Sequence, residues 1–186
     1  MNYIVSYNNA LIPELCEHII EKFEAFSKKH ERTVLDGHRS FTELNISAEK
    51  QWHDINEMLL DKMQDYLKRY MKDFEIDGDT WPKQIGYEQL RVKRYLPNDV
   101  DRFDFHVDVG DYSSARRFLV YFFYLNTVDE GGETCFTLNK KTPPHIKVKP
   151  EEGKLLMFPP LWTHPHIAMK PISGPKYIIG GYLHYV

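Results

Sequence analysis

The chain has 186 residues, a length that suits one domain with a buried core. Its 24 basic and 27 acidic side chains give a formal net charge of -3, which argues against a protein whose main task is to grip nucleic acid. No apolar run approaches the roughly 18 residues of a membrane span, and the N-terminus lacks a signal-peptide pattern. We therefore expect a cytoplasmic protein with no membrane partner.

Two side-chain classes refine this expectation. Cys16 and Cys135 are too few for a disulfide framework, which indicates a reducing compartment. Tyrosine (12) and phenylalanine (11) are plentiful, and this favours an aromatic-lined β core over a helical bundle.

Two amphipathic helices are predicted in the first half of the chain. Pro13 stands at the start of the first, in which apolar side chains recur with helical period as far as Phe26. The second has its apolar positions between Trp52 and Tyr70, and Ser47 is a candidate N-cap for it. The first half is therefore expected to be mainly helical.

The two helices are separated by a polar stretch, about 28–39, that contains the turn signal Asp36-Gly37. From Gln84 onward the pattern changes to short apolar or alternating runs divided by Pro, Gly and Asn turns. The predicted strands are 88–95, 103–109, 118–125, 134–138, 145–148, 154–158, 164–169 and 176–185.

This order of elements predicts an α+β protein that is mainly β. Roughly eight strands in about a hundred residues, behind a helical part, favour a double-stranded β-helix with the helices packed on one face. This fold is the cupin-like jelly roll. The sequence contains no evident linker or repeat, so we expect one domain over 1–186. About 1–83 would be helical support, and about 84–186 the jelly-roll core that carries the site.

His106 and Asp108 are the first candidate functional residues. Side chains two residues apart lie on the same face of a β-strand, so an imidazole and a carboxylate here can point at one metal ion. A third ligand, a distant histidine, would complete the two-His-one-carboxylate set that holds non-haem Fe(II) and leaves positions open. His164 and His166 both qualify by strand parity.

Lys176 is a candidate anchor for an anionic ligand. It follows His166 by ten residues, beyond the turn at 173–175. If that turn forms a hairpin centred near residue 173, Lys176 lies about four residues along the sheet from His166, roughly 13 Å at ~3.3 Å per residue. A dicarboxylate would fit there, with one end on the metal and the other on the ammonium.

Together these residues resemble the prolyl 4-hydroxylase-like branch of the 2-oxoglutarate- and Fe(II)-dependent oxygenases. The resemblance covers about 88–186 and begins with the His-x-Asp of His106 and Asp108. It continues with Arg117 seven residues before Tyr124-Leu125-Asn126, and with the block 130–136, Glu-Gly-Gly-Glu-Thr-Cys-Phe. It ends with His166 followed by Gly174 and Lys176, a spacing that favours His166 over His164.

The resemblance implies a role for each matched residue. His106, Asp108 and His166 would be the iron ligands, and Lys176 would bind the distal carboxylate of 2-oxoglutarate. The other co-substrate contacts it implies are Tyr95 (allowing a one-residue shift), Tyr124 and Thr134. The cofactor set would be Fe(II), with 2-oxoglutarate and O₂ as co-substrates and ascorbate as a candidate reductant.

Two positions qualify the resemblance. That branch often has a tyrosine three residues before the metal histidine, where this chain has Phe103, so either Tyr95 supplies the missing hydroxyl or 2-oxoglutarate loses one hydrogen bond. Related halogenases lack the ligating carboxylate, so Asp108 favours hydroxylation or another oxidation over halogenation. Arg117 is either a surface residue or an active-site residue that faces substrate.

The predicted function is a dioxygenase that hydroxylates a C–H bond, of a prolyl residue in a peptide or protein by resemblance, with release of succinate and CO₂. A free amino acid or small metabolite is the alternative substrate, and 98–105 and 111–117 are candidate substrate-facing loops. A non-catalytic cupin-like metal-binding module is the alternative from another class, but it would have no use for Lys176. A zinc-dependent hydrolase on the same ligands would need no 2-oxoglutarate.

Overall fold

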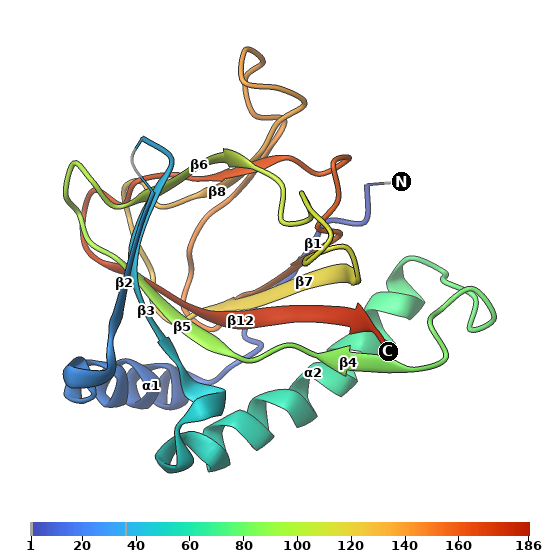
Figure 1. The fold of residues 1–186 in the computed structure, drawn as a ribbon, viewed down its shortest axis with the longest axis horizontal. Helices are drawn as coiled ribbons and strands as arrows, with labels where there is room; N and C mark the ends of the chain where they lie inside the picture. The colour runs from blue at the N-terminus through green and yellow to red at the C-terminus, as the bar shows by residue number, and fades with distance from the viewer. Residues whose placement is uncertain (1, 36) are drawn as a thin grey trace.

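The computed structural model describes residues 2–35 and 37–186, so Asp36 of the predicted turn lies outside the described residues. Within this part of the chain a long antiparallel sheet curls into a nearly closed barrel, and two α-helices pack under one side of it (Figure 1). The expected mainly-β jelly roll with N-terminal helices on one face is confirmed. No helix among the described residues is long and apolar enough to cross a membrane.

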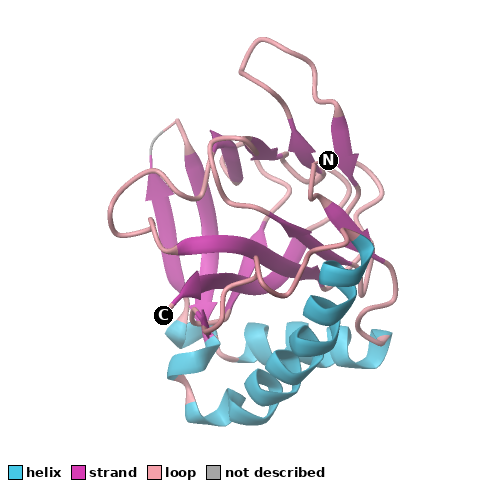
Figure 2. Ribbon diagram, turned by 90° about the vertical axis from the view of Figure 1, so that its right-hand side faces the viewer, coloured by secondary structure: helices cyan, strands magenta, loops and turns pink. Residues whose placement is uncertain are grey.

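The helices lie close to where the sequence predicts them. Helix α1 (Pro13–Ala25) has proline at its first position, and α2 (His53–Asp73) buries a stripe that includes Leu59 and Met63. Figure 2 shows the two helices together on one side of the sheet. The predicted cap is wrong: the Ser47 hydroxyl accepts a hydrogen bond from the Leu90 amide and donates one to Asn56. Ser47 lies within a short 3₁₀ helix, Ile46–Ala48, and a second one, Lys50–Trp52, separates it from the start of α2.

Short strands form the rest of the described chain. They pair antiparallel in the order β1-β10-β7-β12-β5-β3-β6-β11-β8-β9, with β2 beside β3 and β4 beside β12. Their bounds are β1 Val5–Tyr7, β2 Glu31–Leu35, β3 Arg39–Asn45, β4 Ile85–Tyr87, β5 Arg91–Tyr95, β6 Arg102–His106, β7 Arg117–Tyr124, β8 Thr134–Phe136, β9 Ile146–Val148, β10 Leu155–Phe158, β11 His166–Ala168 and β12 Lys176–Tyr185.

Two features of this topology differ from the sequence prediction. The polar stretch before α2 is a hairpin of β2 and β3, so the first half is less helical than expected. The turn at 173–175 does not join a hairpin either, because β11 pairs with β6 and β8, whereas β12 pairs with β4, β5 and β7. The chain crosses from one side of the barrel to the other between β11 and β12.

Alternation along β12 separates the hydrophobic core from the barrel interior. Tyr177, Ile179 and Leu183 belong to the large core shared with α1 and α2. Ile178 and Tyr182, on the other face, pack against a smaller apolar cluster inside the barrel. Successive side chains of a strand point to opposite faces, so Lys176 and Gly180 share the inward face of β12.

Candidate metal centre and co-substrate site

His106 is the last residue of β6, next to an irregularity in the sheet. His106 pairs with His166, but Phe103 pairs with Ala168. Between these two pairs β6 advances by three residues and β11 by only two. This extra residue is a β-bulge, and it puts Phe103 and His106 on the same side of the strand. Their rings stack in parallel with centroids 3.4 Å apart.

Asp108 lies just beyond the strand, in a loop rather than in the longer strand predicted for 103–109. The amides of Asp108 and Val109 both donate to the carbonyl of Pro160, each at 3.1 Å. These two bonds fix the turn of the chain that brings the carboxylate back toward His106.

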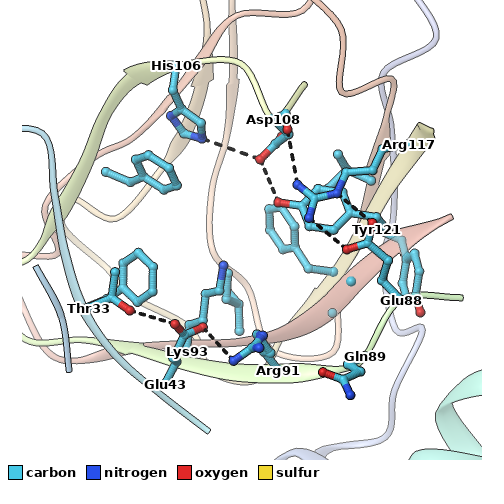
Figure 3. A pocket seen from close by; sticks show the side chains of 18 of the residues that line it. Thr33, Glu43, Glu88, Gln89, Arg91, Lys93, His106, Asp108, Arg117 and Tyr121 are labelled. Carbon is cyan, nitrogen blue, oxygen red and sulfur yellow. Dashed lines mark hydrogen bonds and ion pairs between the residues drawn. The ribbon is translucent and has the colours of Figure 1, made fainter. Parts of the chain in front are cut away.

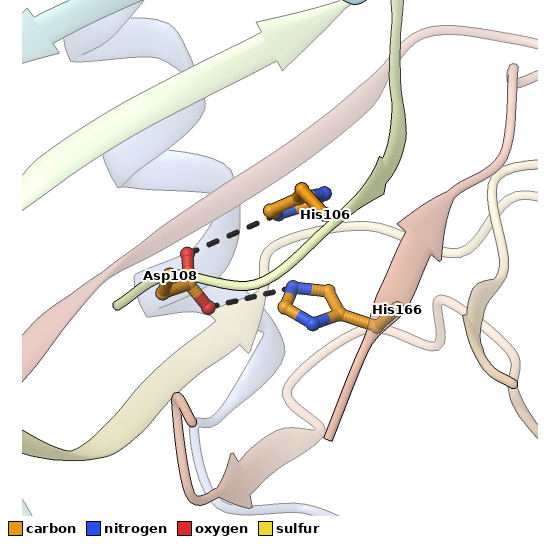
Figure 4. A group of neighbouring side chains, drawn as sticks. All are labelled: His106, Asp108 and His166. Carbon is orange, nitrogen blue, oxygen red and sulfur yellow. Dashed lines mark ion pairs between the residues drawn. The ribbon is translucent and has the colours of Figure 1, made fainter. Parts of the chain in front are cut away.

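The third residue comes from β11, opposite β6. His166 and His106 face each other across the strand pair, with ring centroids 4.1 Å apart. His164 lies outside this group: its Nε2 is 2.6 Å from the carbonyl of Asn2. The structure thus brings His106, Asp108 and His166 together from two strands and one loop (Figure 4).

The geometry of these three residues fits a metal ion. One ligand atom from each lies within 4.8 Å of the others, and the Nε2 atoms of His106 and His166 are 3.9 and 3.5 Å from the two oxygens of Asp108. Asp108 Oδ2 is buried and accepts no hydrogen bond from the described residues. A buried oxygen without a donor is costly unless a cation satisfies it.

Both imidazoles are held in the tautomer that a metal needs. The Nδ1 of His106 donates to the carbonyl of Asp104 at 2.6 Å, and that of His166 to the carbonyl of His164 at 3.1 Å. Each Nε2 therefore keeps its lone pair. Burial lowers the pKa of His106 to about 3, helped by the nearby His166, so the ring stays neutral at pH 7.

A polar network supports Asp108 from the opposite side. The hydroxyl of Tyr182 donates to Asp108 Oδ1 at 2.8 Å. Arg117 donates to the Asp108 carbonyl, stacks 3.9 Å over the Tyr182 ring and forms two hydrogen bonds with Glu88. Arg117 is thus committed to neighbouring protein groups. Sequence reasoning missed Tyr182, although its parity with Lys176 on one strand places both on the inward face.

Lys176 lies at the buried end of the barrel, directly opposite Tyr95 on β5. Its side chain is almost inaccessible, and its ammonium lies 5.5 Å from the ring centres of both Tyr95 and Tyr124. The hydroxyl of Tyr124 donates to Thr134 at 2.7 Å. The four residues predicted to contact a co-substrate therefore lie in one place.

Two features leave Lys176 ready for an anion. Within 4.0 Å its ammonium has no carboxylate among the described residues, and burial lowers its pKa to about 7. Gly132 leaves room beside it, since its φ of +74° suits glycine and an added Cβ would lie 3.4 Å from Lys176 Cδ. An unpaired buried ammonium is unfavourable, so a carboxylate ligand would stabilise it.

A cavity of about 570 Å³ lies beside the metal group (Figure 3). His106, Asp108 and Phe103 line one wall, and Ile178 lines another, one inward-facing position short of Lys176. The floor and rim carry charged side chains that sequence reasoning did not single out: Arg39, Glu43, Glu88, Arg91 and Lys93.

Comparison with known proteins assigns this arrangement to a family. The model of the 2OG-Fe(II) oxygenase superfamily matches residues 90–184, just over half of the chain. The chain belongs to that superfamily. Fe(II), 2-oxoglutarate and O₂ are accordingly the metal and the co-substrates of this oxygenase. No curated protein matches the sequence.

Solved structures share the fold at low sequence identity. A prolyl hydroxylase from Trichoplax adhaerens, in complex with a hypoxia inducible factor oxygen degradation domain peptide fragment, has a TM-score of 0.78 at 18% identity, covering 99% of this chain and 84% of that one. A Pseudomonas putida prolyl-4-hydroxylase gives 0.70 at 14%, covering 100% and 94%. The viral collagen prolyl hydroxylase of Paramecium Bursaria Chlorella virus-1, in its 2OG complex, gives 0.66 at 20%, covering 99% and 96%.

Proposed function

We propose that this oxygenase hydroxylates a C–H bond of a prolyl residue in a peptide or protein. The observation that carries the proposal is the His106, Asp108 and His166 group, two of whose members line the cavity, together with the unpaired buried Lys176, one inward-facing position beyond Ile178 of the cavity wall. The overall reaction would convert 2-oxoglutarate, O₂ and the substrate C–H into succinate, CO₂ and C–OH. One oxygen atom of O₂ enters succinate and the other enters the new hydroxyl group.

The residues of this chain would act by binding and positioning. His106, Asp108 and His166 would hold the iron, and Tyr182 would fix the Asp108 carboxylate. Lys176 would bind the distal carboxylate of 2-oxoglutarate. Bound iron and 2-oxoglutarate supply the activation of O₂.

The prolyl substrate rests on two kinds of support. The sequence motifs resemble the prolyl 4-hydroxylase-like branch, and the structural neighbours include prolyl hydroxylases, one of them in complex with a peptide. Val107 and Asp108 of the loop after β6 line the cavity, so a substrate residue bound there would lie next to the iron position. A free amino acid is the second candidate, favoured by the charged cavity floor.

The first experiment is an anaerobic titration of Fe(II)-loaded protein with 2-oxoglutarate, followed by the weak visible charge-transfer band of the chelate. We expect a band in the wild type, no band in His166→Ala, and a band only at much higher 2-oxoglutarate concentration in Lys176→Ala. His164→Ala is the matched control, because His164 lies two residues from His166 but outside the metal group.

No band in folded, iron-loaded wild type would contradict the proposal and promote the non-catalytic metal-binding module. If the band forms, a screen of prolyl peptides follows, with succinate release and a mass gain of one oxygen atom as readouts. Turnover of free amino acids but of no peptide would replace the peptide substrate with the second candidate.

A further inference from the structure

The cavity floor carries more positive charge than the predicted chemistry uses. On β12, Lys176 and Ile178 are successive inward-facing residues, and they pair with Tyr95 and Lys93 of β5. Lys93 is thus one inward step, roughly 7 Å along the strand, closer to the cavity mouth than the co-substrate anchor. Arg91 lies one further step outward, opposite Gly180.

Lys93 points into the open cavity rather than at a neighbouring acid. Figure 3 shows its side chain rising from the floor toward the middle of the cavity, below His106 and Asp108. Its ammonium lies 4.9 Å from the centre of the Phe41 ring and has no described carboxylate within 4.0 Å. Glu43, its cross-strand partner, instead accepts a hydrogen bond from Thr33 and pairs with Arg91 at 3.7 Å.

Apart from Lys93 and Arg39, the charged residues of the cavity are already paired. Glu88 and Arg117 form a two-point ion pair, Glu43 and Arg91 form a single contact at 3.7 Å, and Asp108 belongs to the metal group. Arg39, at the rim, lies over the Phe103 ring without a described carboxylate within 4.0 Å. Lys93 and Arg39 are therefore surplus cations on the walls that face the substrate.

We infer that Lys93 binds a carboxylate of the substrate, next to the C–H bond that is oxidised. This inference rests on the proposed function and narrows its substrate class to prolyl compounds that carry an acidic group. Two sources share the chemistry: the α-carboxylate of proline itself, free or at a C-terminus, and the acidic side chain of a neighbouring residue. Arg39 would bind the same group, or a second one, at the rim.

The binding of 2-oxoglutarate leaves Lys93 available. That co-substrate has two carboxylates, one for the metal and one for Lys176, whose ammonium lies in the closed end of the barrel between two tyrosine rings. Lys93 stands on the open side, where Thr33, Phe41 and Tyr182 complete the walls. A half-buried ammonium there binds an anion through a charge-assisted hydrogen bond, whereas a neutral apolar ligand would leave it without a partner.

The test uses two pairs of compounds that differ only in charge. N-acetyl-L-proline and its carboxamide test the α-carboxylate, and the capped peptides Asp-Pro-Gly and Asn-Pro-Gly test an acidic neighbour. Binding to Fe(II)- and 2-oxoglutarate-loaded protein is measured without O₂ by calorimetry, and turnover is measured with O₂ as hydroxylated product.

Lys93→Met keeps the length of the side chain and its contact with Phe41, and Lys147→Met on the exposed edge of β9 is the matched control. We expect the acid of at least one pair to bind at least tenfold more tightly than its neutral partner in wild type and in Lys147→Met. Lys93→Met should lose that preference while its 2-oxoglutarate dissociation constant stays that of the wild type.

Two results would overturn the inference while the proposed function stands. The first is equal binding of acid and neutral compounds, or binding of neither, in protein that forms the chelate band. The second is a Lys93→Met variant that binds 2-oxoglutarate as weakly as Lys176→Ala. The second result would make Lys93 part of the co-substrate site. Conversely, acid-selective binding that depends on Lys93 in protein with no chelate band would support the anion site and overturn the oxygenase reaction.

Discussion

At the residue scale, the position of Asp108 depends on groups that no metal motif contains. Its backbone is held by Pro160 and Arg117, and one carboxylate oxygen is held by Tyr182. Partners of this kind orient a ligand before the metal arrives, and their loss typically weakens metal binding by about 10- to 100-fold.

We therefore expect Tyr182→Phe to weaken Fe(II) binding by about tenfold, because Asp108 Oδ1 loses its only side-chain hydrogen-bond donor among the described residues. Competition with a metal-binding dye under anaerobic conditions measures the affinity. Tyr121→Phe is the control, since the buried Tyr121 hydroxyl has no hydrogen-bond partner in the described part of the chain. Equal affinity in both variants would show that the hydroxyl does not support the metal site.

Lys176 should make the binding of 2-oxoglutarate depend on pH. Its pKa of about 7 in the free protein means that the ammonium is lost as pH rises above 7, and the carboxylate then binds only after the amine regains a proton. We expect the dissociation constant to rise by nearly tenfold between pH 7.5 and 8.5 in the wild type. Lys176→Arg, which stays charged, should show a flat profile if it binds. A constant wild-type value over this range would contradict the lowered pKa.

The residues that sequence reasoning reached are those with a recognisable spacing: His106 with Asp108, and His166 with Lys176. The supporting residues have no such spacing. For Tyr182 and Lys93 the sequence predicts the strand and the alternation of its two faces. The groups that each side chain meets depend on which strands are neighbours in the barrel. Glu88 is recognised only through its ion pair with Arg117, a contact between positions 29 residues apart.

At the scale of elements, the hairpin of β2 and β3 forms the cavity wall that the sequence did not predict. Four of the five residues of β2 are exposed, so the strand has no apolar alternation to read. The hairpin is anchored by Asp101, which accepts hydrogen bonds from Arg32, Ser40 and the Leu96 amide. Thr33, Arg39 and Phe41 of this hairpin line the cavity.

Replacing Asp101 should loosen this wall. The carboxylate is fully buried, so Asp101→Ala leaves Arg32 and Ser40 without their common partner, at a cost of about 2 kcal/mol in the free energy of unfolding. Urea denaturation at pH 7 measures it, and limited proteolysis reports opening of the hairpin. Asp104→Ala is the matched control, since its pair with Arg102 is partly exposed and worth at most ~1 kcal/mol. Similar losses in both variants would contradict the anchoring role.

At the scale of the whole molecule, the sequence predicted the jelly roll and the packing side of the helices, but not how the strands meet. Local turn signals located all eight predicted strands of the second half. The assumed hairpin between β11 and β12 failed because a turn at 173–175 can join neighbours or cross the barrel, and only long-range pairing decides between them. The single-domain boundary stays a prediction.

Global stability should fall in mild acid when the metal is absent. The folded-state pKa of His106 lies at about 3, below its ordinary value near 6.5, so below pH 6.5 the unfolded chain takes up a proton that the folded protein does not. From pH 7 to 5 this linkage lowers the free energy of unfolding by about 2 kcal/mol.

Urea denaturation of metal-free protein at both pH values tests this linkage. His106→Gln, which does not titrate, should lose about 2 kcal/mol less than the wild type between pH 7 and 5. The exposed His53→Gln serves as the control and should behave like the wild type. Equal pH dependence in wild type and His106→Gln would show that His106 titrates normally.

Strand β12 carries both Lys176 and Tyr182, six residues apart on one inward face. The span between Lys176, the proposed anchor of 2-oxoglutarate, and Tyr182, which holds Asp108, is therefore a fixed number of residues, about 20 Å of strand. No loop length enters it. We expect insertions or deletions in the β2–β3 hairpin to change substrate selectivity and to leave this span intact, whereas a single-residue insertion within β12 should turn either Lys176 or Tyr182 away from the inward face. To change selectivity, the β2–β3 hairpin is the segment to vary, and the length of β12 is the feature to keep.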